Sequence, residues 1–172
     1  MRDTPPMNDD LRNLTVRLLD EHRIMTIATN RRDGWPQATV VGYANDGLTI
    51  YCFVSRLSQK FVNITRDNRV SIAIAGDFSD PLQIKGLSLA AKAVPLEEKN
   101  EFARASEVFL KRYPEYASWG CPDPKIAPML RITPEIISVL DYSKGFGHSD
   151  LVSVSPSDLT ATQSRSNWLA SA

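Results

Sequence analysis

The side chains best suited to chemistry gather in the middle of the chain, in residues 48–75, LTIYCFVSRLSQKFVNITRDNRVSIAIA. Residues 55–60 supply two hydroxyls, a guanidinium and an ammonium at the start of an expected short helix. Backbone N–H groups at a helix start lack partners within the helix, so hydroxyls and cations beside them can surround a phosphate dianion. The pattern predicts a phosphate-binding cluster of Ser55, Arg56, Ser58, Gln59 and Lys60.

The same side chains also have a simpler structural interpretation. Ser55 can be the N-cap of the helix, Ser58 an ordinary first-turn residue and Lys60 a solvated charge. Taken alone, a Ser-x-x-Ser-x-Lys pattern more often has this meaning than that of a binding site. The sequence around the cluster is therefore needed to choose between the two interpretations.

A strand is expected on each side of this cluster. In residues 48–54, apolar side chains occupy both alternating faces, which is typical of a strand covered on both sides. Leu57, Phe61 and Ile64 then recur at positions i, i+4 and i+7, so we expect them to share the buried side of the short helix. Residues 67–69 turn the chain into a second strand, residues 70–75, with large and small side chains in alternation.

The residues before this stretch predict a helix and two further strands. Residues 8–21 have leucines at helical spacing behind an Asn-Asp-Asp cap, which is typical of an amphipathic helix. Strands are expected at residues 24–29 and 38–43. The turns Arg32-Asp33-Gly34 and Asn45-Asp46-Gly47 follow them and carry hairpin signals. Consecutive antiparallel strands of this kind can close into a barrel, which leaves no sheet edge exposed.

The residues after it predict two more strands and a second helix. Residues 82–93 form a long strand in which Gly86 marks a bulge or a close backbone approach. Pro95 opens a helix that stops at Tyr113, and residues 129–141 form a final strand broken near Pro134. Beyond Tyr142 periodicity is lost, so we expect one domain, residues 1–150, and a tail or arm, residues 151–172.

The amino-acid composition indicates which kind of ligand or partner the chain can bind. The 172 residues, 42% of them apolar and 23% charged, suit a single globular domain. Twenty acidic and twenty basic residues cancel, which argues against nucleic-acid or anionic-membrane binding and favours a small molecule. Cys52 and Cys121 resemble neither a disulfide framework nor a metal site, and no signal or membrane segment is apparent, so a cytoplasmic location is expected.

The ordered set of motifs resembles a known family over about residues 20–140. The motifs are, in sequence, the two hairpin strands with their Asp-Gly turns, the strand-Ser-x-Lys-helix unit, the Asn-x-Arg-Val-Ser turn and the segment Gln83-Ile84-Lys85-Gly86. Their order is that of the pyridoxamine 5'-phosphate oxidase-like family. The resemblance implies a mainly β chain with flanking helices, folded as a six-stranded antiparallel split β-barrel that binds FMN.

The resemblance also implies a site shared by a homodimer. Ser58, Gln59 and Lys60 match the family's phosphate-binding residues, although Gln59 and Thr39 stand where relatives have arginines. The other residues implied to contact the flavin or its side chain are Ala38, Thr39, Val40 and Val41 through their backbone, Asn63, Gln83, and His148 in a glycine-rich loop.

The expected activity follows from the cofactor. The carboxy-terminal Arg-His signature of the true oxidase has no counterpart here, which argues against vitamin B6 oxidation. We expect an FMN-dependent oxidoreductase with an unknown small-molecule substrate and with NAD(P)H as a candidate partner; no catalytic residue is assigned. The alternatives are a deazaflavin-dependent reductase and a non-catalytic flavin or haem binder, for which His148 is the candidate ligand.

Overall fold

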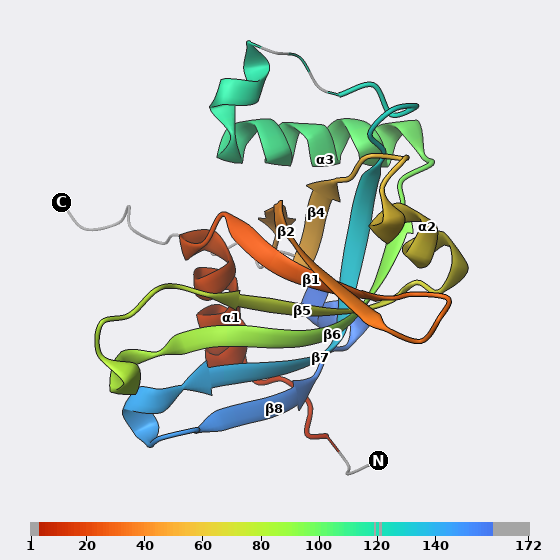
Figure 1. Ribbon diagram of the computed structural model, residues 1–172. Coiled ribbons are helices and arrows are strands. Elements are labelled where there is room, and N and C mark those ends of the chain that lie inside the picture. Colours follow the sequence, from red (N-terminus) through yellow and green to blue (C-terminus); the bar gives the residue numbers. More distant parts are fainter. Residues whose placement is uncertain (1–3, 119, 121, 160–172) are drawn as a thin grey trace, which may run out of the picture.

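The computed structural model describes residues 4–118, 120 and 122–159 (Figure 1). These residues form one mainly antiparallel sheet of eight strands with flanking helices. The strands are β1 Ile24–Asn30, β2 Pro36–Gly42, β3 Ala44–Asp46, β4 Thr49–Phe53, β5 Arg69–Ala75, β6 Lys85–Pro95, β7 Met129–Asp141 and β8 Ser149–Ser153. The helices are α1 Asp9–Glu21, α2 Gln59–Arg66, α3 Lys99–Arg112 and α4 Pro156–Leu159, with 3-10 turns η1 Pro81–Gln83, η2 Pro114–Ala117 and η3 Tyr142–Lys144.

The sheet curls into a split barrel. Its strand order is β2-β1-β5-β6-β7-β4-β3, with β8 pairing on β7. Figure 1 shows β7 turning from the upright layer that holds β4 into the layer that holds β6 and β8. The register between β6 and β7 shifts between Ala90 and Ala91, opposite Pro134 and Ile136, and such a bulge sharpens the local bend. The predicted mainly β fold with flanking helices is confirmed.

The strand count is eight in the described residues rather than six. Two short strands escape the sequence pattern. Strand β3 is only 3 residues long and lies in the predicted Asn45-Asp46-Gly47 turn, where Gly47 adopts a φ of 60°. Strand β8 lies beyond Tyr142, where hydrophobic alternation is weak, and its pairing with β7 orders it instead.

Two clusters of apolar side chains cover the two faces of β4. Ile50 and Cys52 lie in the main core, which α1 covers with Leu18 and Leu19. On the opposite face, Tyr51 joins a second core formed with α3. The predicted strand with both faces covered is confirmed. Burial raises the pKa of the Cys52 thiol to about 12, so this cysteine is a packing residue rather than a nucleophile.

The amino-terminal segment lies against β8. The backbone N–H of Ser153 donates to the carbonyl of Pro5 at 2.8 Å, and the N–H of Met7 donates to the carbonyl of Ser153 at 3.1 Å. The predicted boundary between domain and tail at residue 150 therefore falls inside β8. Residues 160–172 of the predicted arm lie outside the described part of the chain.

One predicted boundary near β6 is wrong, and of the two features predicted at Gly86 the close backbone approach is present. Pro95 ends β6 instead of opening a helix, and α3 starts at Lys99 after the N-cap Glu98. The bulge lies at Ala90, whereas Gly86 marks a close backbone approach, because a Cβ there would lie 2.7 Å from the Ile74 carbonyl oxygen. Hydrogen bonding to β5 and β7, which cannot be read from β6 alone, sets both features.

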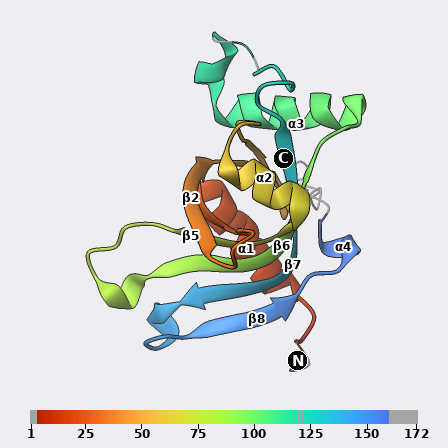
Figure 2. The ribbon, with the colours of Figure 1, turned by 45° about the vertical axis from the view of Figure 1, so that its right-hand side comes forward.

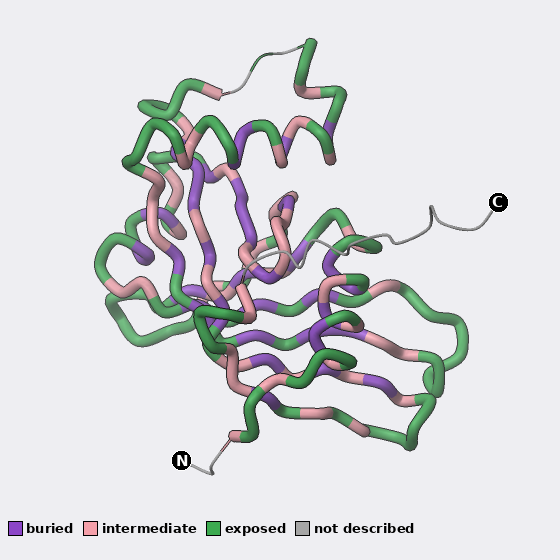
Figure 3. Tube along the Cα trace, turned by 180° about the vertical axis from the view of Figure 1, so that it is seen from behind, coloured by how far each residue is buried: buried purple, intermediate pink, exposed green. Residues whose placement is uncertain are grey.

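Burial follows the sheet. Figure 3 shows buried positions concentrated in the strands and exposed positions in the turns that connect them. Within the described residues, no helix combines the length and the apolar character that crossing a membrane requires.

The close approach at Gly86 makes a stability prediction. Gly86→Ala inserts a methyl group against the Ile74 carbonyl, so the β5–β6 pair must separate, at a cost of about 1–3 kcal/mol in the free energy of unfolding. Urea denaturation followed by circular dichroism measures this cost. Ser88→Ala, an exposed position on the same strand, is the control and should change the free energy by less than about 0.5 kcal/mol. Equal effects of the two substitutions would contradict the close approach.

Candidate functional site

The predicted phosphate-binding cluster lies at the start of α2, in residues 55–60, which we call the α2 start. Ser58, not Ser55, is the N-cap: its Oγ accepts from the N–H of Phe61 at 3.3 Å. The Ser58 hydroxyl also donates to the Ser55 carbonyl, and the Ser55 hydroxyl accepts from the N–H of Leu57. Both serine hydroxyls therefore serve the turn that begins the helix, as the simpler interpretation expects.

The helix begins four residues later than the sequence pattern predicts. Leu57 precedes α2 and is 95% exposed, so its predicted place on the buried face is wrong. Phe61 and Ile64 are buried, as predicted. The error arises because apolar spacing alone does not show where a helix starts, whereas the cap at Ser58 does.

Three donor groups at the α2 start have no partner among the described residues. No such residue accepts a hydrogen bond from the backbone N–H groups of Gln59 and Lys60, and none forms an ion pair with the Lys60 ammonium. These groups sit at the positive end of the helix dipole. The α2 start therefore presents two amide donors and one cation to an incoming anion.

The other charged side chain of the α2 start is engaged elsewhere. The Arg56 guanidinium donates to the carbonyls of Lys125 and Pro124 at 2.9 and 3.2 Å, and it stacks over the Phe61 ring. Arg56 thus holds the loop that leads into β7 against α2. Lys60 is then the cation at the α2 start that remains available to a ligand.

Asn63 forms a buried polar junction between α2 and the β1–β2 hairpin. Its side chain is 1% exposed, and its Nδ2 donates to Thr29 Oγ1 at 3.0 Å and to Gln37 Oε1 at 3.2 Å. Its Oδ1 accepts from Gln59 Nε2 at 2.9 Å. Asn63 is therefore buried, although asparagine is usually exposed at protein surfaces. Asn63 sets the position of the α2 start relative to β2, which Figure 2 shows beside it.

Strand β2 has one unpaired edge. It pairs with β1 and ends the strand order, so no other strand in the described part of the chain uses the backbone groups on its outer side. Ala38 and Val40 are exposed on the outer face, and Thr39 and Val41 point toward the interior. The Thr39 hydroxyl is buried and has no hydrogen-bond partner among the described residues.

Two arginines that the sequence analysis did not single out lie near the α2 start. Arg31 and Arg32, in the β1–β2 turn, border a hollow of about 350 Å³ together with Asp33 and Gln59. The signal in the sequence was a pair of adjacent arginines in the turn that precedes β2. Their proximity to α2 depends on the Asn63 junction, which no local pattern shows.

Gln83 and His148 form a second group. Gln83 is exposed in η1, not in a strand as predicted, because Asp80 caps a 3-10 turn and β6 begins only at Lys85. His148 Nε2 lies 3.2 Å from Asp150 Oδ2, which also pairs with Lys144. Hydrogen bonding to Lys144, followed by smaller effects of His148, lowers the pKa of the Asp150 carboxyl.

The two groups lie at opposite ends of the sheet. Helix α2 is joined through Asn63 to Thr29, which pairs with Val70 at the beginning of β5, whereas η1 follows the end of β5 and contacts η3. A strand of 7 residues spans about 20 Å. In Figure 1, α2 and the turns η1 and η3 accordingly appear on opposite sides of the molecule. One chain cannot bring Gln83 or His148 to the α2 start.

No metal site is apparent in the described residues. No group of three or more His, Cys, Asp or Glu side chains among them is arranged to hold a metal ion.

The Asn63 junction makes a second prediction. Asn63→Ala leaves the buried Thr29 hydroxyl and the half-buried Gln37 amide oxygen without their donor, so the free energy of unfolding should fall by about 1–3 kcal/mol. Gln59→Ala removes only the outer hydrogen bond and should cost less than about 1 kcal/mol. Chemical denaturation of both variants without added ligand measures the difference. A larger loss for Gln59→Ala would contradict the central role of Asn63.

Solved structures from several bacteria share this fold. A haem-binding protein from Mycobacterium smegmatis is 25% identical, with a TM-score of 0.67 over 81% of this chain and 55% of that chain, so this chain spans about half of its length. A conserved hypothetical protein from Mycobacterium tuberculosis is 27% identical, with a TM-score of 0.65 over 86% and 94% of the two chains. A FAD-binding protein from Mesorhizobium loti, 18% identical with a TM-score of 0.59 over 77% and 92%, is similar in fold alone.

Comparison of the sequence with family models identifies the family of this chain. A comparison with curated proteins found no match. The family model described as pyridoxamine 5'-phosphate oxidase, however, matches residues 12–138, from α1 to the middle of β7. That range contains the strands β1 to β6, most of β7 and the α2 start, and it covers well over half of the chain, so the chain belongs to the pyridoxamine 5'-phosphate oxidase family.

Proposed function

We propose that two copies of this chain bind FMN between them and that the loaded dimer is an oxidoreductase acting on a small molecule. The observation that carries this proposal is the α2 start, where the N–H groups of Gln59 and Lys60 and the Lys60 ammonium have no partner among the described residues. Such groups suit a phosphate dianion. The family membership supports a phosphorylated flavin as the source of that dianion.

The residues beside the α2 start fit the rest of the cofactor. The unpaired edge of β2 offers backbone donors and acceptors along residues 38–41, and the unpartnered hydroxyl of Thr39 lies on the same strand. When bound there, FMN supplies hydride or electron transfer. The chain's own part is to hold the phosphate, to orient the ring along β2 and to limit access to it. We assign no side chain as an acid or a base.

A second copy completes the site. Gln83 and His148 lie at the far end of the sheet, so they contact the cofactor only if another subunit contributes them. The outer faces of β1, β2 and β5 give that subunit a surface to cover, since Ile24 and Val40 are 60% and 64% exposed and border a hollow with Ala73 and Ala75. Exposed apolar side chains that gather in this way are typical of an interaction surface.

Haem binding is the second candidate. The observation in its favour is His148, whose imidazole is oriented by Asp150 at 3.2 Å, as metal-binding histidines commonly are. A structurally similar protein from Mycobacterium smegmatis binds haem. The absorption spectrum of the purified protein separates the candidates, because flavin absorbs in the blue, a deazaflavin absorbs at shorter wavelength, and haem gives a Soret band.

Lys60 makes the third prediction. A hydrogen bond to a charged group contributes about 1.5–3 kcal/mol, so Lys60→Ala should weaken FMN binding by about 10- to 150-fold. Fluorescence titration with FMN measures this, and the same titration with riboflavin, which lacks the phosphate, should change by less than about 3-fold. Lys111→Ala, an exposed lysine on α3, is the matched control. An unchanged FMN affinity, or an equal loss for riboflavin, would place the phosphate elsewhere.

The subunit interface makes the fourth prediction. Sedimentation of the FMN-loaded protein should give twice the 19.2 kDa mass of one chain. Ala73→Glu places a charge on the exposed sheet face and should yield a monomer that binds FMN at least about 10-fold more weakly. Ala103→Glu adds the same charge to an exposed position of α3 and should leave the dimer intact. A monomer that binds FMN as tightly as the parent would rule out a shared site.

A further inference from the structure

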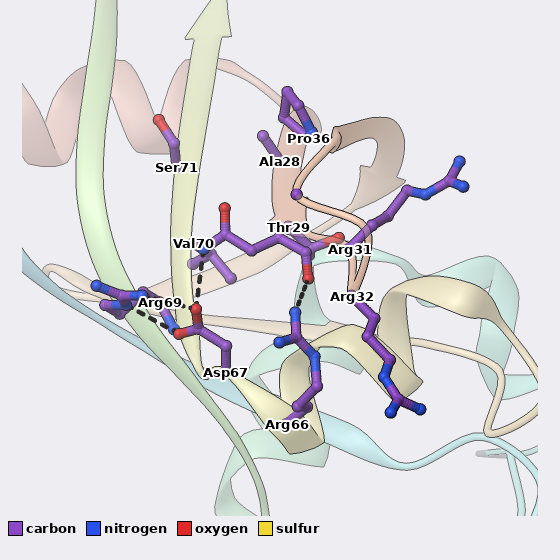
Figure 4. A pocket seen from close by; sticks show the side chains of 12 residues that line it. Ala28, Thr29, Arg31, Arg32, Pro36, Arg66, Asp67, Arg69, Val70 and Ser71 are labelled. Carbon is purple, nitrogen blue, oxygen red and sulfur yellow. Dashed lines mark hydrogen bonds and ion pairs between the residues drawn. The ribbon is translucent and has the colours of Figure 1, made fainter.

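The molecule has a second charged pocket, at the other end of α2 (Figure 4). It has a volume of about 660 Å³ and lies where the β1–β2 hairpin, the last turn of α2 and the beginning of β5 meet. We call it the arginine pocket, because Arg31, Arg32, Arg66 and Arg69 line it. Arg66 and Lys60 are six residues apart on α2, so the pocket opens about 9 Å along the helix from the α2 start.

Two of these arginines are neutralised by carboxylates. Arg69 donates from Nε and Nη2 to the two oxygens of Asp67 at 2.9 and 2.8 Å. This pairing, with further hydrogen bonds from the Arg69 backbone and from Asn30, holds the pKa of the Asp67 carboxyl well below its usual range. Arg31 pairs with Asp33 at 2.6 Å. Both ion pairs are local to the turns that carry them.

The other two arginines leave an excess of positive charge. Arg32 and Arg66 have no carboxylate at ion-pair distance among the described residues. Arg66 is held in place because its Nη2 donates to the Asn30 carbonyl at 2.7 Å, which leaves its other N–H groups available. Figure 4 shows Arg66 rising from α2 toward the β1–β2 hairpin, across the pocket from Ser71. The pocket wall therefore carries about two uncompensated positive charges on one anchored and one free guanidinium.

The floor of the pocket is formed by small side chains, one of which is polar. Ala28 and Ser71 are adjacent across β1 and β5, and both leave room above the sheet. The Ser71 hydroxyl is exposed and has no hydrogen-bond partner among the described residues, so it can donate to a ligand. None of the described residues that line the pocket is aromatic. This lining suits a compact, strongly anionic group and not a flavin or porphyrin ring.

We propose that the arginine pocket binds the phosphate or diphosphate group of a small molecule, as a site separate from the α2 start. Two uncompensated guanidiniums match a dianion, and the planar guanidinium binds phosphate oxygens in pairs. The volume lies within the range of about 300–1,000 Å³ that is usual for small ligands. The zero net charge of the chain argues against a general attraction to polyanions, which favours a small phosphate ester over a nucleic acid. The proposal goes beyond the proposed function and does not depend on it.

Calorimetric titration with inorganic pyrophosphate at low ionic strength tests the proposal. Saturable binding with a Kd of about 1 mM or tighter is expected, and no saturation up to about 10 mM overturns it. Arg32→Gln and Arg66→Gln should each weaken pyrophosphate binding by about 10-fold or more. The Arg32 side chain makes no hydrogen bond to any residue that the structure describes, so its variant stays informative even if Arg66→Gln proves unstable.

Two controls separate this pocket from general charge and from the α2 start. Arg17→Gln removes the same charge from an exposed position on α1 and should leave binding within about 3-fold of the parent. An equal loss in that variant means non-specific screening and overturns the proposal. Lys60→Gln and saturating FMN should both leave pyrophosphate binding unchanged. Competition by FMN would assign the arginines to the flavin site and overturn the proposal of a separate pocket. If FMN does not bind at all, the proposed function fails, but pyrophosphate binding that depends on Arg32 and Arg66 still supports the arginine pocket.

Discussion

The amide of Asn63 is the interaction on which the candidate sites depend. One buried side chain joins α2 to Thr29 on β1 and to Gln37 on β2, and thereby sets the helix against the hairpin. The unpartnered donors of the α2 start and the guanidinium of Arg66 lie at the two ends of this helix. A buried amide with both hydrogens engaged is costly to disrupt, so the geometry at both ends of α2 is held by the same few hydrogen bonds.

The roles proposed for the residues of the α2 start follow from which of their donor groups are already hydrogen-bonded. Within residues 55–60, the serine hydroxyls shape the turn and Arg56 anchors the loop before β7, which leaves Lys60 and two backbone amides for a ligand. Thr39 and Gln59 supply no cation at the positions where relatives have arginines, and Arg31 and Arg32 of the hairpin turn border the hollow beside Gln59. The turn between β1 and β2 therefore carries two arginines that border two hollows.

Regular elements were predictable because their side chains repeat. The two covered faces of β4, the spans of α1 and β7 and the hairpin at Gly47 follow from alternation, capping and turn residues in the sequence. Features set by pairing were not predictable, including the strands β3 and β8, the start of β6 at Lys85 and the burial of Asn63. The candidate site was located by its order of motifs. Arg31 needed the fold because it lies far from the α2 start in sequence, and Arg66 needed it because only the fold brings the end of α2 against the hairpin.

The unpaired edge of β2 has a consequence for solubility as well as for binding. An open strand edge is a template for another strand, and natural proteins shorten or cover such edges to avoid aggregation. Here Pro36 begins the strand and lacks an N–H, and Gly42 ends it, so only a short run of backbone is exposed. A ligand or a second subunit that lies along β2 covers this strand edge. Occupation of the proposed site would therefore also protect the chain from edge-to-edge assembly.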